Sequence, residues 1–64
     1  MTIDYGTLIR TRRKELGLSQ SELADMAMCH RTTVVKAEQG QGMTLDVFLS
    51  ILGAMDLKVD IVEA

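Results

Sequence analysis

The feature that most constrains the fold is the short distance between successive helix-start and helix-stop signals. Gly17 has the residue type that usually ends a helix, and Ser19 follows with Glu22 three positions later. That spacing is a capping box, which satisfies two backbone donors at a helix start. Gly40 then begins a loop, and Thr44 can cap another helix. Only short helices fit between these positions.

Apolar residues recur at helical spacing in four segments, so we expect four helices. Their ranges are Asp4–Leu16, Ser19 to a bend near residues 28–29, Arg31–Gln39, and Thr44 to about Met55. The side chains expected to face inward are Tyr5, Leu8, Ile9, Leu16, Leu23, Ala24, Ala27, Val34, Ala37, Leu45, Phe48, Leu49 and Leu52.

The end of the chain has a different period. In LKVDIVE, Leu57, Val59 and Ile61 alternate with other residues, a pattern typical of a β-strand. A lone strand leaves its backbone groups unpaired, so we expect it to pair antiparallel with the same strand of a second copy. The alternative partner is the N-terminal segment 2–5 of the same chain.

The fourth helix supports a homodimer independently, because it is apolar over most of its circumference and needs burial on more than one side. A wider core within one chain is the alternative. The expected fold is all-α: one compact four-helix domain over residues 1–64 with a short C-terminal β-strand, paired across a homodimer. The expected interface residues are Val47, Ile51, Met55, Leu57, Val59 and Ile61.

Several classes of function are disfavoured by size and composition. A chain of 64 residues buries too little surface to build a sizeable catalytic cleft. It has one His, one Cys and no glycine-rich phosphate loop, so no nucleophile with a base can be assembled, and we expect neither enzymatic activity nor a cofactor. Cys29 beside His30 lacks the further ligands of a metal site.

Without a long apolar run or a leader, the chain is expected to be cytoplasmic and not membrane-bound.

The segments YGTLIRTRRKELGLSQSELADMA, TTVVKAEQG and LDVFLSILGAMDLKVDIV together resemble the Cro and phage-repressor (XRE) helix-turn-helix family, and within it most closely the HipB-type antitoxins. The resemblance implies a helix-turn-helix core at 19–39 and a dimerisation helix and strand at 44–63. It also implies a repressor of its own operon that binds a palindromic operator in double-stranded DNA and is encoded with a HipA-like kinase toxin.

Two alternatives remain open. One is a protein-interaction module that inhibits a partner, with weak or no DNA binding. The other is a phage or restriction-modification controller, which would have a helical C-terminus.

The resemblance assigns the third helix to the DNA major groove, which admits one helix. Opposite its buried residues lie the expected base readers, Arg31, Thr32, Val35 and Lys36. The expected phosphate contacts are Ser19, Gln20, Thr33 and Gln39. A solvated helix face, with Ser19 acting only as a cap, is the simpler interpretation without the resemblance. The resemblance further suggests that Glu38 pairs with Arg13.

The formal charge of −2 is distributed unevenly. Residues 1–40 carry six basic and five acidic side chains, whereas residues 41–64 carry one basic and four acidic ones. Acidic groups more than about 8 Å from a phosphate are largely screened at physiological salt, so the acidic end does not exclude DNA binding. Three departures from the family pattern stand out: Met28 replaces the usual glycine of the bend, His30 occupies a capping position better suited to Ser or Thr, and Cys29 stands where a buried aliphatic residue is expected.

Overall fold

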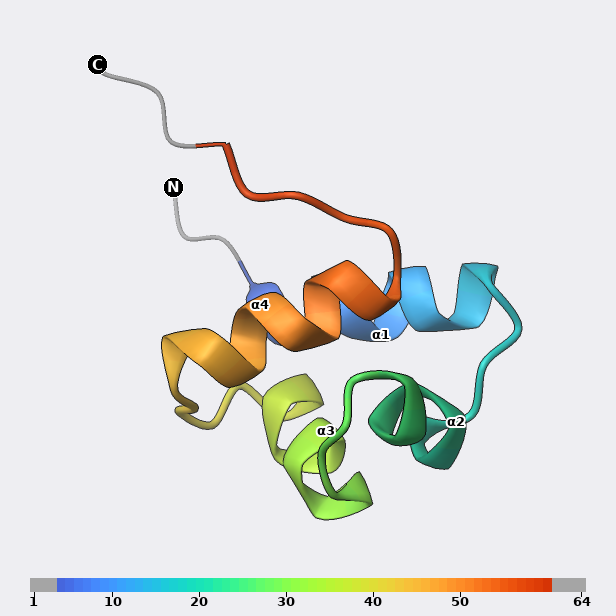
Figure 1. Cartoon of the computed structure of the whole chain (residues 1–64), viewed down its shortest axis with the longest axis horizontal. Helices are drawn as coiled ribbons and strands as arrows, with labels where there is room; N and C mark the ends of the chain where they lie inside the picture. The colour runs from blue at the N-terminus through green and yellow to red at the C-terminus, as the bar shows by residue number, and fades with distance from the viewer. Residues whose placement is uncertain (1–3, 61–64) are drawn as a thin grey trace.

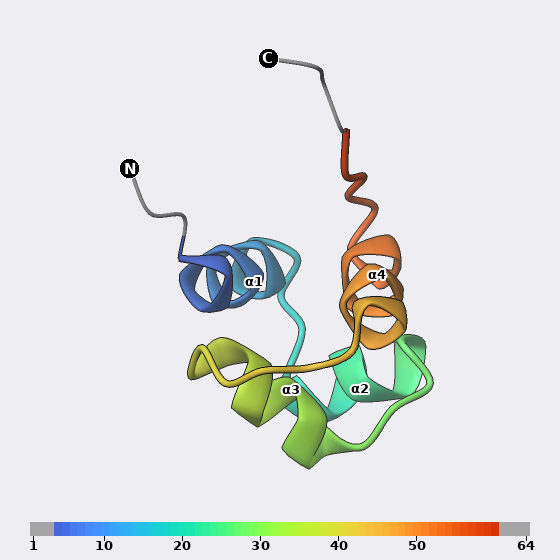
Figure 2. The same cartoon turned by 90° about the vertical axis from the view of Figure 1, so that its left-hand side faces the viewer.

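The computed structural model describes residues 4–60, and in this range the chain forms four helices. These are α1 (Tyr5–Glu15), α2 (Gln20–Met26), α3 (Arg31–Glu38) and α4 (Leu45–Ala54) (Figure 1). Helix α3 packs against both α1 and α2, and α4 packs against α2. Figure 2 shows α1 and α4 on the same side of the α2–α3 pair. The four predicted helices are confirmed, each with bounds within one or two residues of the expected ones.

None of the helices described in residues 4–60 is long and apolar enough to cross a lipid bilayer.

Side-chain caps fix where three of these helices begin. The Asp4 carboxylate accepts a hydrogen bond from the Thr7 backbone N–H at 3.1 Å, and the Thr44 hydroxyl accepts one from the Val47 N–H at 3.3 Å. Ser19 forms the predicted capping box at the start of α2. His30 precedes α3 without a side-chain hydrogen bond to it, which agrees with the poor capping ability of imidazole.

All four helices end in the same backbone motif. After each helix one residue has a positive φ, and the two N–H groups that follow the last turn bond back to its carbonyls, which is the Schellman arrangement. Gly17 and Gly40 fill this position after α1 and α3, with φ of +69° and +79°. Met28 and Asp56 fill it after α2 and α4, with φ of +58° and +60°. The bend that lacks glycine in the sequence therefore has the left-handed backbone that glycine would favour.

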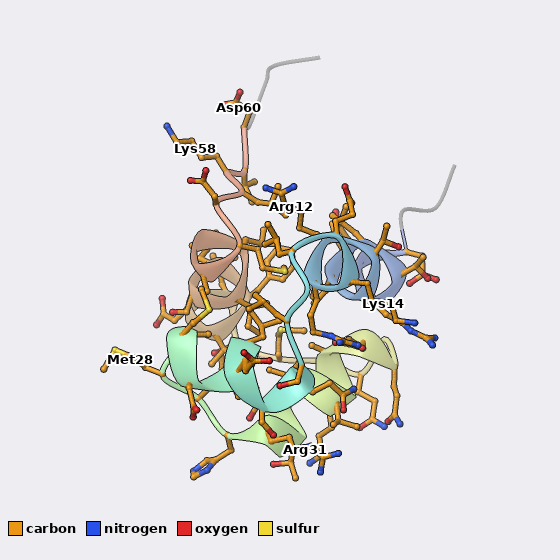
Figure 3. All side chains as sticks on the ribbon, turned by 90° about the vertical axis from the view of Figure 1, so that its right-hand side faces the viewer. Arg12, Lys14, Met28, Arg31, Lys58 and Asp60 are labelled. Atoms are coloured by element: carbon orange, nitrogen blue, oxygen red, sulfur yellow. The ribbon has the colours of Figure 1, made fainter. Side chains whose placement is uncertain are left out.

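Replacing Met28 by glycine should raise the free energy of unfolding by up to about 1 kcal/mol, because the left-handed conformation is strained for any residue with a Cβ atom. The greater freedom of glycine in the unfolded chain offsets part of this gain. The Met28 side chain is 92% exposed and projects from the molecule (Figure 3), so its removal takes no packing contact away from the core. Thermal unfolding followed by circular dichroism measures the effect. Met26→Gly, a change at the half-exposed last residue of α2, is the control and should destabilise the protein by up to about 1 kcal/mol. A Met28→Gly melting temperature no higher than that of the wild type would contradict the assignment of strain.

The core is aliphatic and draws on all four helices. Its buried members are Ile9, Leu23, Ala24, Ala27, Val34, Ala37, Ile51, Leu52 and Met55. The inward residues predicted for α2 and α3 are confirmed. Cys29 packs half-buried against this core, and burial raises the pKa of its thiol, so the thiol stays protonated at neutral pH. In α1 only Ile9 of the expected stripe is buried, while Tyr5, Leu8 and Leu16 remain 43 to 51% exposed.

Helix α4 presents a different face to the core from the expected one. Ile51 and Met55, which were expected at a subunit interface, have no exposed surface within the single chain. Leu45 and Leu49, which were expected in the core, are 68% and 44% exposed. Both faces of α4 are apolar, so the periodicity of the sequence does not determine which face is buried. The docking of α4 on α2 determines it.

The predicted C-terminal β-strand is wrong. Residues 57–60 form no strand, the chain after Leu57 leads away from the helices (Figure 2), and residues 4–60 contain no other strand that could pair with this segment. The reason lies in the end of α4, where the Leu57 N–H donates to the Leu52 carbonyl at 2.9 Å and Leu57 packs against the core. An apolar residue at this place commonly accompanies a Schellman ending, which accounts for the start of the alternating pattern. Ile61 and residues 2–3 of the segment 2–5 lie outside the described residues.

Candidate nucleic-acid interface

Helix α3 is held by its buried side and leaves a polar side free. Val34 and Ala37 are 0% and 2% exposed and anchor the helix to the core. Arg31, Thr32 and Lys36 are exposed, and Val35 is half-buried. Figure 3 shows Arg31 at the outer surface, at the end of the molecule opposite to Lys58 and Asp60. The expected base readers therefore share a surface that is accessible to a macromolecular ligand and distant from the acidic C-terminal segment.

A largely buried ion pair joins α3 to α1. The Nε of Arg13 donates to Oε2 of Glu38 at 2.6 Å, and Nη2 donates to Oε1 at 3.1 Å, which is the two-pronged geometry that suits a guanidinium and a carboxylate. Their side chains are only 11% and 6% exposed. The hydrogen bonds that Arg13 donates to Glu38 raise the pKa of Arg13, so the guanidinium stays charged. The structure thus brings together the two residues that the resemblance suggested as partners.

The same ion pair also makes hydrogen bonds to residues at and just before the start of α2. A third donor of Arg13, Nη1, bonds the Leu18 carbonyl at 2.9 Å just before α2. The Nε2 of Gln20 lies 3.4 Å from Oε1 of Glu38 and donates to it. Arg13 and Glu38 therefore connect α1, α2 and α3.

The capping box gives α2 a fixed start beside this pair. The Ser19 N–H donates to Oε1 of Glu22 at 2.9 Å, and the Glu22 N–H donates to the Ser19 hydroxyl oxygen at 3.0 Å. These bonds lower the pKa of Glu22, so its carboxylate is ionised at neutral pH and the box is intact. Ser19 consequently has a structural role whether or not it touches a phosphate.

A polar cleft of about 460 Å³ opens where α1, the start of α2 and the end of α3 meet. It collects three of the four expected phosphate contacts, Ser19, Gln20 and Gln39, whereas Thr33 does not line it. The remaining lining residues are Arg10, Arg13, Val35 and Glu38. Arg10 was not predicted to belong to this surface. Its sequence signal was its position three residues before Arg13, which places the two side chains on the same side of a helix.

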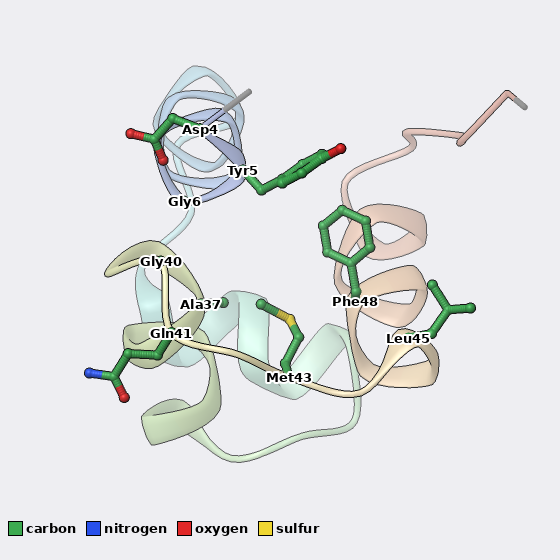
Figure 4. Close-up of a pocket in the computed structure, with 9 residues that line it drawn as sticks. All are labelled: Asp4, Tyr5, Gly6, Ala37, Gly40, Gln41, Met43, Leu45 and Phe48. Atoms are coloured by element: carbon green, nitrogen blue, oxygen red, sulfur yellow. The ribbon is translucent and has the colours of Figure 1, made fainter. Parts of the chain in front are cut away.

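A second, mostly apolar groove lies between the start of α1 and α4 (Figure 4). Its volume is about 750 Å³, and Tyr5 and Phe48 meet across it edge to face with ring centroids 5.4 Å apart. Leu45 and Met43 also line it.

Of the expected interface residues, Val59 is 49% exposed, Val47 and Leu57 are half-buried against the core, and Ile61 lies outside the described residues.

Comparison with known proteins also identifies a helix-turn-helix arrangement in this chain. Residues 9–62 match the model of a family described as helix-turn-helix. A 35-residue stretch is 51% identical to an uncharacterized HTH-type transcriptional regulator of Methanothermobacter thermautotrophicus. The aligned stretch covers 55% of this chain and 51% of that protein, so the chain matches about half the length of its curated relative.

Proposed function

The chain belongs to the helix-turn-helix family, and from this membership we propose that it is a DNA-binding transcriptional regulator that inserts α3 into the major groove of its operator. The observation that carries the proposal is the free polar side of α3, where Arg31 and Lys36 are exposed and form no ion pair within residues 4–60. Arg31 can donate two hydrogen bonds to guanine O6 and N7. Lys36 can reach the same acceptors or a phosphate, and Thr32 or Val35 can contact a thymine methyl group.

Arg31→Ala should weaken binding to the operator by roughly ten- to a hundredfold, because a two-pronged arginine–guanine contact contributes about 1 to 3 kcal/mol of discrimination. Fluorescence anisotropy with a labelled duplex from the chain's own promoter, against a scrambled duplex, measures this at two salt concentrations. Lys58→Ala removes the same charge at the far end of the molecule and serves as the control (Figure 3). Equal and feeble binding of the wild type to both duplexes would contradict the proposal.

We further propose that the protein acts as a homodimer on a palindromic operator. Support comes from the exposed apolar side chains of α1 and α4, among them Tyr5, Leu45 and Leu49. Burying them against a second copy would enlarge the small hydrophobic core, and two copies reading two half-sites would raise the affinity for DNA. Sedimentation equilibrium at micromolar concentration tests the proposal, and a monomer there would overturn it.

An antitoxin role, with a HipA-like kinase toxin as partner, is the more specific proposal. Residues 57–60 form no strand, so the resemblance to HipB-type antitoxins now lies in the segment Ile9–Gln20. The groove between α1 and α4 is the observation that favours binding of a partner protein. Co-expression with the product of the adjacent reading frame, followed by size-exclusion chromatography, tests for a complex. Without a complex, a phage-type or restriction-modification controller becomes the better interpretation.

A further inference from the structure

The polar cleft between α1, α2 and α3 has an excess of hydrogen-bond donors and positive charge. Arg10 comes from α1, Gln20 from the first turn of α2, and Gln39 directly follows α3. Each of these three side chains carries N–H donors. Three residues from three elements therefore surround one open cleft with groups suited to an anion.

The charge balance of the cleft depends on which residues are already paired. Glu38 is the acidic residue among the lining side chains, and its carboxylate accepts bonds from Arg13 and Gln20. Its negative charge is therefore compensated by the Arg13 guanidinium. Arg10 forms no ion pair in the part of the chain that the structure describes, and it is exposed. One full positive charge thus remains for a ligand.

We propose that Arg10 of α1 is a further, cationic contact to the phosphodiester group of the DNA backbone that Ser19, Gln20 and Gln39 are expected to meet at this cleft. The proposal rests on the function proposed above. The free side of α3 adjoins the cleft through Val35. When a helix lies in the major groove, the surfaces that flank it face the sugar-phosphate backbone, where contacts set the position of the protein but read no bases. Arg10 thereby adds α1 to an interface expected only from α2 and α3.

A backbone contact makes a distinctive prediction for Arg10→Ala. Binding should weaken roughly tenfold on the promoter duplex and on the scrambled duplex alike, because a hydrogen bond to a charged group contributes about 1.5 kcal/mol or more. A plot of log affinity against log salt concentration should become shallower by about 0.9 for each lost phosphate contact. Arg10→Lys keeps the charge and should retain most of the salt slope.

The measurement is fluorescence anisotropy on both duplexes over a series of salt concentrations, with circular dichroism to show that each variant is folded. Lys58→Ala controls for the loss of one charge and should leave the slope unchanged. An Arg10→Ala variant that keeps the wild-type affinity and slope overturns the cleft proposal while leaving the proposed function intact. A loss confined to the promoter duplex also overturns it, since Arg10 would then read bases. Failure of the wild type to bind either duplex overturns both proposals.

Discussion

Glu38→Ala should lower the free energy of unfolding by about 3 to 5 kcal/mol, the range typical for removing one partner of a buried ion pair. The reason is that Arg13, whose side chain is 11% exposed, would keep its charge with no carboxylate beside it. Gln20 would lose the acceptor of its hydrogen bond as well. A small domain has a total stability of only about 5 kcal/mol or slightly more, so a loss at the upper end of this range would leave a large share of the variant unfolded at room temperature.

Urea unfolding followed by circular dichroism measures this loss. Glu15→Ala removes an exposed carboxylate from α1 and should change the stability by no more than about 0.5 kcal/mol. The double variant Arg13→Ala/Glu38→Ala should be less destabilised than the sum of the two single variants, because the second change removes the unpaired charge. An unchanged melting temperature for Glu38→Ala would show that the pair contributes nothing to the fold.

Gly6→Ala should destabilise the protein by about 1 to 3 kcal/mol, as expected for an atom forced into a packed contact. A Cβ atom at Gly6 would lie 2.5 Å from the Glu38 carbonyl oxygen and 3.0 Å from that of Ala37. Both atoms belong to the backbone of α3 and cannot rotate away, so α1 would have to move off α3. Such a movement would also disturb the Arg13–Glu38 pair and the polar cleft.

The control for Gly6 is the same substitution in another helix. A Cβ atom at Gly53 in α4 would have no neighbour within 4 Å. Gly53→Ala should therefore stabilise the protein by about 0.5 to 1 kcal/mol through helix propensity alone. The two variants, compared by thermal unfolding, should shift the melting temperature in opposite directions. Shifts of the same sign would refute the close contact between α1 and α3.

Both of these predictions concern the contact between α1 and α3. The sequence pointed to some residues of this contact and not to others. The Arg13–Glu38 pair was suggested by a family resemblance, and the buried position of Val34 and Ala37 by helical spacing. Gly6 carried no signal, because a glycine inside a helical pattern is equally compatible with a weak helix and with a close approach of two backbones. Arg10 carried only the signal of its spacing, three residues before Arg13.

The sequence by itself determined the local structure, because caps and helix stops act through neighbours a few residues away. Ser19 with Glu22, Gly17, and Thr44 set the limits of the helices through hydrogen bonds within three to five residues along the chain. The spacing of Val34 and Ala37 likewise determined which side of α3 is buried.

Only the tertiary structure decided between alternatives that are locally equivalent. Helix α4 is apolar on two faces, and its docking on α2 buried Ile51 and Met55 and left Leu45 and Leu49 exposed. The alternating residues after α4 required a strand partner from elsewhere, and within residues 4–60 none is present, so Leu57 packs against the core instead. The polar cleft exists because α1, α2 and α3 meet around the Arg13–Glu38 pair. Burial and pairing between distant segments depend on the whole arrangement of the chain, and for that reason periodicity and capping signals do not specify them.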